Sequence, residues 1–96
     1  MKTKQAISKR RLQQYINELV AIAKARTDDV AFVSNIPGDE EQHAWLKIYV
    51  PNDLAEQIDD LVVQRAHDIF IDTGYSIGAI VYEKSQLIDH AAETEA

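Results

Sequence analysis

The 96-residue chain contains no cysteine, which excludes disulfides, thiolate metal sites and a cysteine nucleophile. Its three glycines are too few and too scattered for a loop that cradles phosphate groups. No apolar run approaches the roughly 20 residues that span a bilayer, and no signal-peptide core follows the basic start MKTKQAISKRRLQQY. These absences favour a cytoplasmic protein without a membrane segment or a cofactor.

Residues suited to metal binding or catalysis are few. His43, His67 and His90 are scattered, and no pair has the i, i+4 spacing that places two imidazoles on one side of a helix. Ser34 has no obvious His and Asp partners, so nucleophilic catalysis is not supported. The sequence therefore predicts neither a histidine metal site nor a catalytic serine.

Three consecutive carboxylates, Asp39, Glu40 and Glu41, follow the turn signal Pro37-Gly38. Adjacent acids on a loop can share a divalent ion, but a hard cation needs several converging oxygens. Two interpretations stay open, a residual metal-dependent activity and a solvated polar turn. The second is favoured, so no metal site is predicted.

Charge is unevenly distributed along the chain, whose net charge is −6. Residues 1–26 carry seven basic residues and one acid, whereas residues 27–96 carry three basic residues and fifteen acids. The cluster Lys9, Arg10 and Arg11 is a possible basic contact for a ligand, or the basic helix lies against the acidic remainder. The acidic remainder argues against duplex DNA as the main ligand, because phosphate attraction supplies most non-specific affinity, and nucleic acid is not the favoured partner.

The first half of the chain has helical and then strand-like patterns. Residues 8–26 are predicted as a helix with Ser8 as its N-cap and an apolar stripe. Residues 30–34 are predicted as a short buried strand, followed by a loop over 35–42 and a strand over 44–50. In the second strand, period-two alternation places Leu46, Ile48 and Val50 on the core side and Trp45, Lys47 and Tyr49 on the other. The predicted stripe of the helix consists of Leu12, Ile16, Leu19, Val20 and Ala23.

The second half repeats the alternation of helix and strand. Asp53 followed by Glu56 resembles a capping box that opens a second helix, and Gly74 is suited to the left-handed position after its end. Residues 75–82 are predicted as a third strand, parallel to the second, while the first two strands pair antiparallel. Residues 83–92 are predicted as a short helix, and residues 1–7 and 93–96 as flexible termini. The predicted stripe of the second helix is Leu54, Ile58, Leu61, Val62, Ala66 and Ile69.

These patterns predict one α+β domain over residues 1–96, with a small mixed sheet of about three strands and the order α-β-β-α-β-(α). The alternating side chains Trp45, Lys47 and Tyr49 can stack on a base or sugar with the lysine near a phosphate. They can equally be the covered side of the sheet, under the N-terminal helix or a second subunit. The sequence favours a covered side or a partner interface.

Two stretches share a layout with a known enzyme family. The first, AFVSNIPGDEEQHAWLKIYV, contains a strand that ends at Ser34 and a loop with Gly38-Asp39. The second, LAEQIDDLVVQRAHDIFIDTGYSIGAIVYEKSQL, contains a helix, a glycine turn, an apolar strand and the start of another helix. Over residues 8–92 the chain resembles a minimal nucleotidyltransferase of the polymerase-beta-like superfamily. The resemblance implies the corresponding fold and a match of Ser34 to the family's motif serine.

The chain departs from this family where chemistry would occur. Val33 replaces the motif glycine, and the two metal-binding aspartates fall at Trp45 and Lys47. Nucleotidyl transfer requires carboxylates that hold Mg²⁺ and neutralise phosphates. Because tryptophan cannot ligate the metal and lysine repels it, the resemblance implies a nucleotidyltransferase-like domain that is not an enzyme.

The leading hypothesis is a non-catalytic protein that acts through protein–protein contacts. Its partner is a second copy of the chain or, as the resemblance implies, a small helical protein of the HEPN type. The predicted interface residues are Trp45, Lys47, Tyr49 and Ser34. The alternative is a regulatory domain that binds a nucleotide or single-stranded nucleic acid through Trp45, Lys47 and Tyr49, helped by Lys9, Arg10 and Arg11.

Overall fold

The computed structural model describes residues 8–38 and 42–85. Its elements are helix α1 (Lys9–Lys24), strand β1 (Ala31–Asn35), strand β2 (Ala44–Val50), a 3₁₀ turn (Asn52–Leu54), helix α2 (Ala55–Thr73) and strand β3 (Ile77–Glu83). The sheet has the order β1-β2-β3, with β1 antiparallel and β3 parallel to β2. The predicted α+β class and mixed three-stranded sheet are confirmed.

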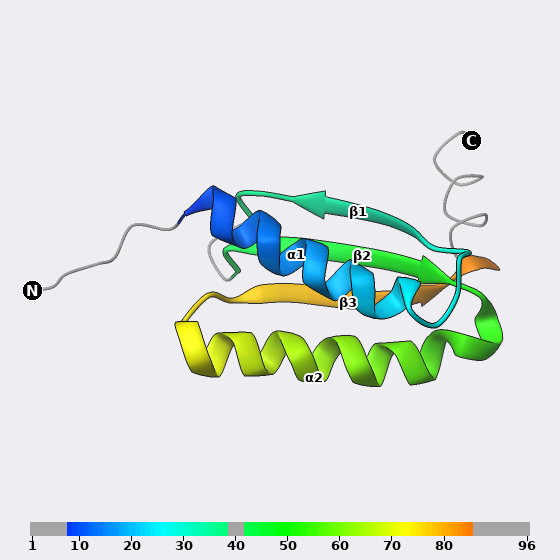
Figure 1. Cartoon of the computed structure of the whole chain (residues 1–96). Coiled ribbons are helices and arrows are strands. Elements are labelled where there is room, and N and C mark those ends of the chain that lie inside the picture. The colour runs from blue at the N-terminus through cyan, green and yellow to red at the C-terminus, as the bar shows by residue number, and fades with distance from the viewer. Residues whose placement is uncertain (1–7, 39–41, 86–96) are drawn as a thin grey trace, which may run out of the picture.

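Both helices pack on the same face of the sheet (Figure 1). The core between the two layers contains Leu46, Ile48 and Val50 of the central strand, each with 0% exposure. Their partners are Ile16 and Leu19 of α1 and a stripe of α2. The fold therefore has two layers, because the alternation of β2 gives it one apolar side on which α1 and α2 rest. The buried stripe of α2 is Ala55, Ile58, Val62, Ala66 and Ile69.

Helix α1 begins as its sequence predicts. The Oγ of Ser8 accepts a hydrogen bond from the backbone N–H of Arg11 at 3.2 Å, which satisfies one of the free donors at the helix start. All five residues of the predicted stripe are buried. The helix ends at Lys24, two residues before the predicted end at Arg26.

The start of α2 differs from the prediction. Asp53 lies inside the 3₁₀ turn and α2 begins at Ala55, without a side-chain hydrogen bond that caps the helix. The capping-box prediction is therefore wrong, because the turn after Pro51 shifts the helix start past Asp53. The predicted end is confirmed, since Gly74 has φ 82° and its N–H donates to the carbonyl of Phe70 at 2.8 Å.

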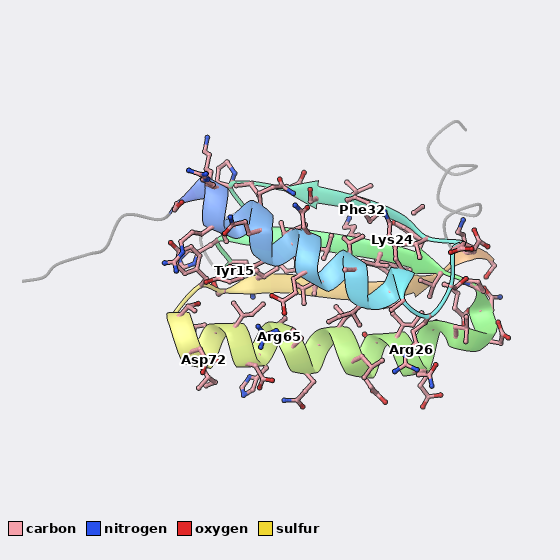
Figure 2. The ribbon with its side chains drawn as sticks, in the orientation of Figure 1. Tyr15, Lys24, Arg26, Phe32, Arg65 and Asp72 are labelled. Atoms are coloured by element: carbon pink, nitrogen blue, oxygen red, sulfur yellow. The ribbon has the colours of Figure 1, made fainter. Side chains whose placement is uncertain are left out.

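Strand β1 is less buried than predicted. It occupies one edge of the sheet, and Phe32 and Val33 are 41% and 54% exposed. On the helix side, the Nζ of Lys24 lies 5.8 Å from the centre of the Phe32 ring (Figure 2). The prediction of a buried strand over residues 30–34 is wrong in its burial, because the helices leave Phe32 partly exposed at this edge and Val33 lies on the side of the sheet opposite the helices.

Hydrogen bonds between the residues that precede β2 and those that precede β3 fix how the two strands align. The N–H of His43 donates to the carbonyl of Ser76 at 2.9 Å, and the N–H of Ser76 donates to His43 Nδ1 at 3.1 Å. The adjacent Tyr75 is 5% exposed and packs edge-on against Tyr15 of α1, with ring centroids 5.5 Å apart. These contacts set the register in which Trp45 lies beside Gly78.

Strand β3 begins at Ile77 and not at the predicted residue 75, because Tyr75 and Ser76 belong to the segment that joins α2 to β3. Of the predicted last helix, Lys84 and Ser85 are helical and residues 86–92 lie outside the described residues. The predicted flexible termini, 1–7 and 93–96, also lie outside them.

The two helices are joined by an ion pair on their outer side. The Nε of Arg65 in α2 lies 2.5 Å from Oε2 of Glu18 in α1, and both side chains are about two-fifths exposed. The hydrogen bond from Arg65 to Glu18 raises the pKa of the guanidinium above its ordinary value. The guanidinium therefore stays charged at any ordinary pH, and the exposure of the ion pair makes its contribution to stability small and sensitive to salt.

Candidate functional site: the free face of the sheet

The side of the sheet opposite the helices carries an aromatic surface. Strand pairing places Trp45 beside Gly78, Lys47 beside Ile80, and Tyr49 beside Tyr82. From β1, Val33 pairs with Lys47 and belongs to the same side. We call this surface, formed by alternate residues of all three strands, the free face. Its residues are Ala31, Val33, Asn35, Trp45, Lys47, Tyr49, Gly78, Ile80 and Tyr82.

Trp45 lies directly over the backbone of Gly78. A Cβ atom built on Gly78 would fall 2.5 Å from Cε3 of the indole ring. Only a residue without a side chain leaves room for the ring, so Gly78 permits the close approach of an aromatic group to the strand. The six-membered ring of the indole therefore lies close against β3 at Gly78.

The centre of the free face combines stacked rings with one charge. The rings of Tyr49 and Tyr82 are stacked at a centroid distance of 5.2 Å and an interplanar angle of 19°. Lys47 is exposed on the same strand between Trp45 and Tyr49. Tyr49 is only 8% exposed, and the ring of Tyr82 covers one of its faces. The surface is thus flat, aromatic and positively charged at one point, which suits contact with a macromolecule better than enclosure of a small ligand.

Not every predicted site residue belongs to the free face. Ser34 pairs with Leu46 and therefore lies on the helix side of the sheet, apart from Trp45. Lys9, Arg10 and Arg11 occupy the first turn of α1, which packs on the helix side. The structure does not bring these basic residues together with Lys47, so residues 8–38 and 42–85 form no continuous basic and aromatic track for single-stranded nucleic acid.

The N-terminal helix does not cover the aromatic side chains of β2. The sequence leaves open whether α1 lies over Trp45, Lys47 and Tyr49, but α1 packs against the opposite side of the sheet. That interpretation is therefore wrong. The physical reason is that the apolar stripe of α1 packs against the fully buried aliphatic side chains of β2, which lie on the side of the sheet opposite the aromatic ones.

Sequence reasoning missed six of the nine residues of the free face. These six join the predicted residues only through strand pairing, and they are Ala31, Val33, Asn35, Gly78, Ile80 and Tyr82. The alternation in IGAIVYE was a usable signal, since it places Gly78, Ile80 and Tyr82 on one side of a strand. Only the register with β2 shows that this side of β3 belongs to the free face.

The described residues contain no group of three His, Cys, Asp or Glu that suits a metal ion. The candidate acids Asp39, Glu40 and Glu41 lie outside the described residues. We expect about 5 mM Mg²⁺ to shift the melting temperature (Tm) by less than about 1 °C. A site with a dissociation constant of that order would add about 0.4 kcal/mol, which raises Tm by roughly 2–3 °C in a domain of this size.

The measurement is a thermal melt followed by circular dichroism with and without the ion. A variant with Asp39→Asn, Glu40→Gln and Glu41→Gln serves as the control. A shift above about 2 °C that this variant abolishes would restore the metal hypothesis.

Neither helix of the described residues is both long and apolar enough to cross a bilayer. No protein-family model, no curated protein and no solved structure matches the chain. The nucleotidyltransferase resemblance therefore stays a prediction from the sequence.

Proposed function

We propose that this protein is a non-catalytic interaction module that binds a partner protein on the free face of its sheet. The observation that carries the proposal is the layering of the fold. Both helices pack on one side, and in residues 8–38 and 42–85 no element covers the other side, which carries Trp45, Tyr49 and Tyr82. An aromatic sheet face of this kind is suited to receiving a third layer.

The chemistry of the free face favours a partner other than a second copy. Lys47 is its only charged residue, and the face contributes no carboxylate. Two copies packed face to face would bring their Lys47 side chains to one interface without a compensating charge, which disfavours association. A partner helix with an apolar side on the rings and a carboxylate beside Lys47 fits better. The nucleotidyltransferase resemblance suggests the same kind of partner, a helical protein of the HEPN type.

The proposal of a non-catalytic role depends on the same strand. Trp45 and Lys47 stand where the resemblance requires two metal-binding aspartates. An indole and an ammonium group supply neither the ligands for Mg²⁺ nor a negative charge. The side chains at these positions are suited instead to apolar contact and to pairing with a carboxylate.

The test compares two exposed apolar residues on different surfaces. Val33→Asp places a charge on the free face, where Val33 is 54% exposed, whereas Ile71→Asp does the same on α2, where Ile71 is 65% exposed. Tagged full-length variants are used to isolate partners from lysate of the source cells, and the bound proteins are quantified by mass spectrometry. We expect one helical protein to be retained by the wild type and by Ile71→Asp. Val33→Asp should reduce its recovery at least about tenfold, which corresponds to about 1.4 kcal/mol.

Light scattering on the purified chain decides between the two partner types. The monomer has a mass of 10.9 kDa, and we expect this mass in the absence of the partner. A dimer that Val33→Asp dissociates and Ile71→Asp leaves intact would make a second copy the partner. Equal recovery of every bound protein by the two variants, together with a monomeric mass, would refute the role of the free face.

A further inference from the structure

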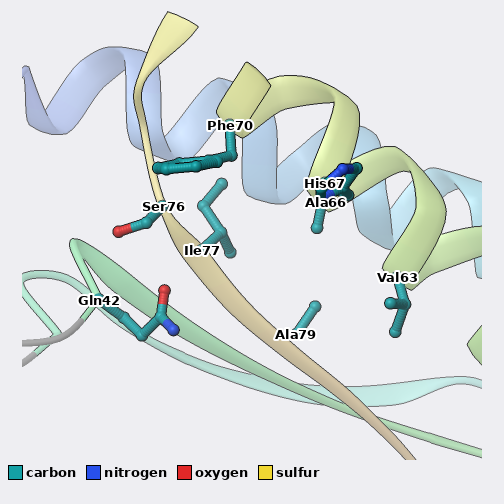
Figure 3. A pocket seen from close by; sticks show the side chains of 8 residues that line it. All are labelled: Gln42, Val63, Ala66, His67, Phe70, Ser76, Ile77 and Ala79. Atoms are coloured by element: carbon teal, nitrogen blue, oxygen red, sulfur yellow. The ribbon is translucent and has the colours of Figure 1, made fainter. Parts of the chain in front are cut away.

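A groove runs between α2 and the outer edge of β3, on the side of α2 away from Arg65 and its contact with α1. Its larger hollow has a volume of about 420 Å³ and is lined mainly by apolar side chains of both elements (Figure 3). These include Val63 and Phe70 of α2, and Ile77 and Ala79 of β3. We call this hollow, together with a second hollow beside Val81 that residues of α2 and β3 also line, the β3 groove.

Strand β3 forms one edge of the sheet and pairs only with β2 among the described elements. Every second backbone N–H and C=O group of an edge strand points away from its neighbour and is available to another strand. β3 spans seven residues, which is long enough for an ordinary strand to pair along it. The edge is therefore a template for an added strand.

The groove is apolar at the start of β3. Val63 and Phe70 are 45% and 48% exposed and lie seven residues apart, so they project from the same side of α2. Ala66 lies between them in the lining of the hollow. Side chains from one face of an added strand would lie in this hollow and cover these two residues.

The groove is acidic at the end of β3. A second hollow of about 360 Å³ is lined by Glu56, Asp59 and Glu83, together with Ala55 and Val81. No lysine or arginine lines either hollow. If two copies paired antiparallel through β3, each acidic end would meet the apolar end of the other copy, which offers no basic group. The chemistry favours an occupant that is apolar at one end and basic at the other.

We propose that the β3 groove binds an extended segment of a partner protein, which adds a fourth strand antiparallel to β3. Antiparallel pairs are slightly more stable than parallel pairs and occur more often. In this direction the segment has lysine or arginine at its N-terminal end, beside Asp59 and Glu56. Apolar side chains at alternate positions follow and enter the hollow beside Phe70. This surface is separate from the free face and does not depend on the function proposed for it.

The probe is a fluorescein-labelled peptide of about nine residues, the length of an ordinary strand, with two N-terminal lysines followed by alternating valine and threonine. Its binding to the full chain is measured by fluorescence polarisation. We expect Phe70→Ala to weaken binding at least about tenfold. The matched control Ile71→Ala removes an adjacent exposed apolar residue that does not line the groove, and it should change binding less than about twofold.

Charge is tested with a second matched pair on α2. Asp59 lines the acidic hollow of the groove, whereas Asp60 lines a different hollow beside Arg26. We expect Asp59→Lys to weaken binding of the basic peptide about tenfold more than Asp60→Lys does. A peptide with its two lysines at the C-terminal end should bind more weakly than the original one. The reverse order of the two peptides would overturn the antiparallel direction.

Strand pairing is tested through the backbone of the peptide. N-methylation at alternate positions removes the N–H groups that face β3 in one set of peptides and those that face solvent in the other. We expect one set to lose binding and the other to keep it.

Equal effects of both sets of N-methylated peptides, or equal effects of Phe70→Ala and Ile71→Ala, would refute the proposal. So would much tighter peptide binding after removal of residues 1–7, because the chain's own basic start would then occupy the groove. Val33→Asp should leave peptide binding unchanged, which separates this result from the test of the free face.

Discussion

Leu46→Ala is expected to lower the free energy of unfolding by about 3 kcal/mol, the usual cost of truncating a fully buried leucine. Leu46 has 0% exposure and lies on the central strand, between the sheet and the two helices. A domain of about a hundred residues has a total stability of roughly 5–14 kcal/mol. The substitution should therefore remove a large part of it, as measured by urea denaturation of the purified variant.

The matched control is Lys47→Ala, one position further along the same strand. Lys47 is exposed on the free face, so its truncation should change the free energy of unfolding by less than about 0.5 kcal/mol. The two variants share the strand, the neighbouring strands β1 and β3 and the alanine product, and they differ in the side of the sheet. A larger loss for Lys47→Ala than for Leu46→Ala would mean that the register of β2 is shifted by one residue, which exchanges its two sides.

Gly78→Ala is expected to lower the free energy of unfolding by about 1–3 kcal/mol, the range for overpacking a well-packed site. The added methyl group would collide with the ring of Trp45. The backbone of Trp45 cannot easily move away, because β2 is paired with β1 on one side and with β3 on the other. The ring must then tilt away from β3. Because the chain has one tryptophan, its fluorescence emission should change together with the stability.

Gly74→Ala separates steric collision from backbone strain. Gly74 has φ 82°, and no atom lies within 4 Å of a Cβ built there. Its substitution should cost about 1 kcal/mol through the left-handed backbone alone, without a change in the emission of Trp45. A double-mutant cycle completes the test, since Gly78→Ala should cost less when Trp45→Val removes the ring. An unchanged cost in the Trp45→Val background would contradict the contact.

Much of the fold follows from local patterns in the sequence. Helix α1 is predicted because its cap at Ser8 and its apolar stripe agree, and both are confirmed. The alternation in β2 predicts its two sides, and Leu46, Ile48 and Val50 are fully buried as expected. These features depend on residues near each other in the chain, so periodicity is sufficient to find them.

The features that were missed depend on the arrangement of whole elements. Phe32 and Val33 are apolar and strand-forming, but β1 lies at an edge, and an edge position cannot be read from five residues. The acid at Asp53 matches a capping pattern, yet the turn after Pro51 competes with it. Ser34 and Trp45 are both predicted as interface residues, but they lie on opposite sides of the sheet. Only the register of β1 with β2 reveals this difference.

Strand β3 connects the two surfaces described above through its two sets of side chains. Gly78, Ile80 and Tyr82 belong to the free face, whereas Ile77 and Ala79 line the β3 groove. A fourth strand paired with β3 would widen the free face and hold its edge in place. Binding at the groove should then raise the affinity of the free face for its own partner. By thermodynamic reciprocity, the partner on the free face must raise the affinity of the groove by the same factor. Occupation of both proposed sites would thus be cooperative, because one edge strand contributes to each, and the small domain would respond to the simultaneous presence of two ligands.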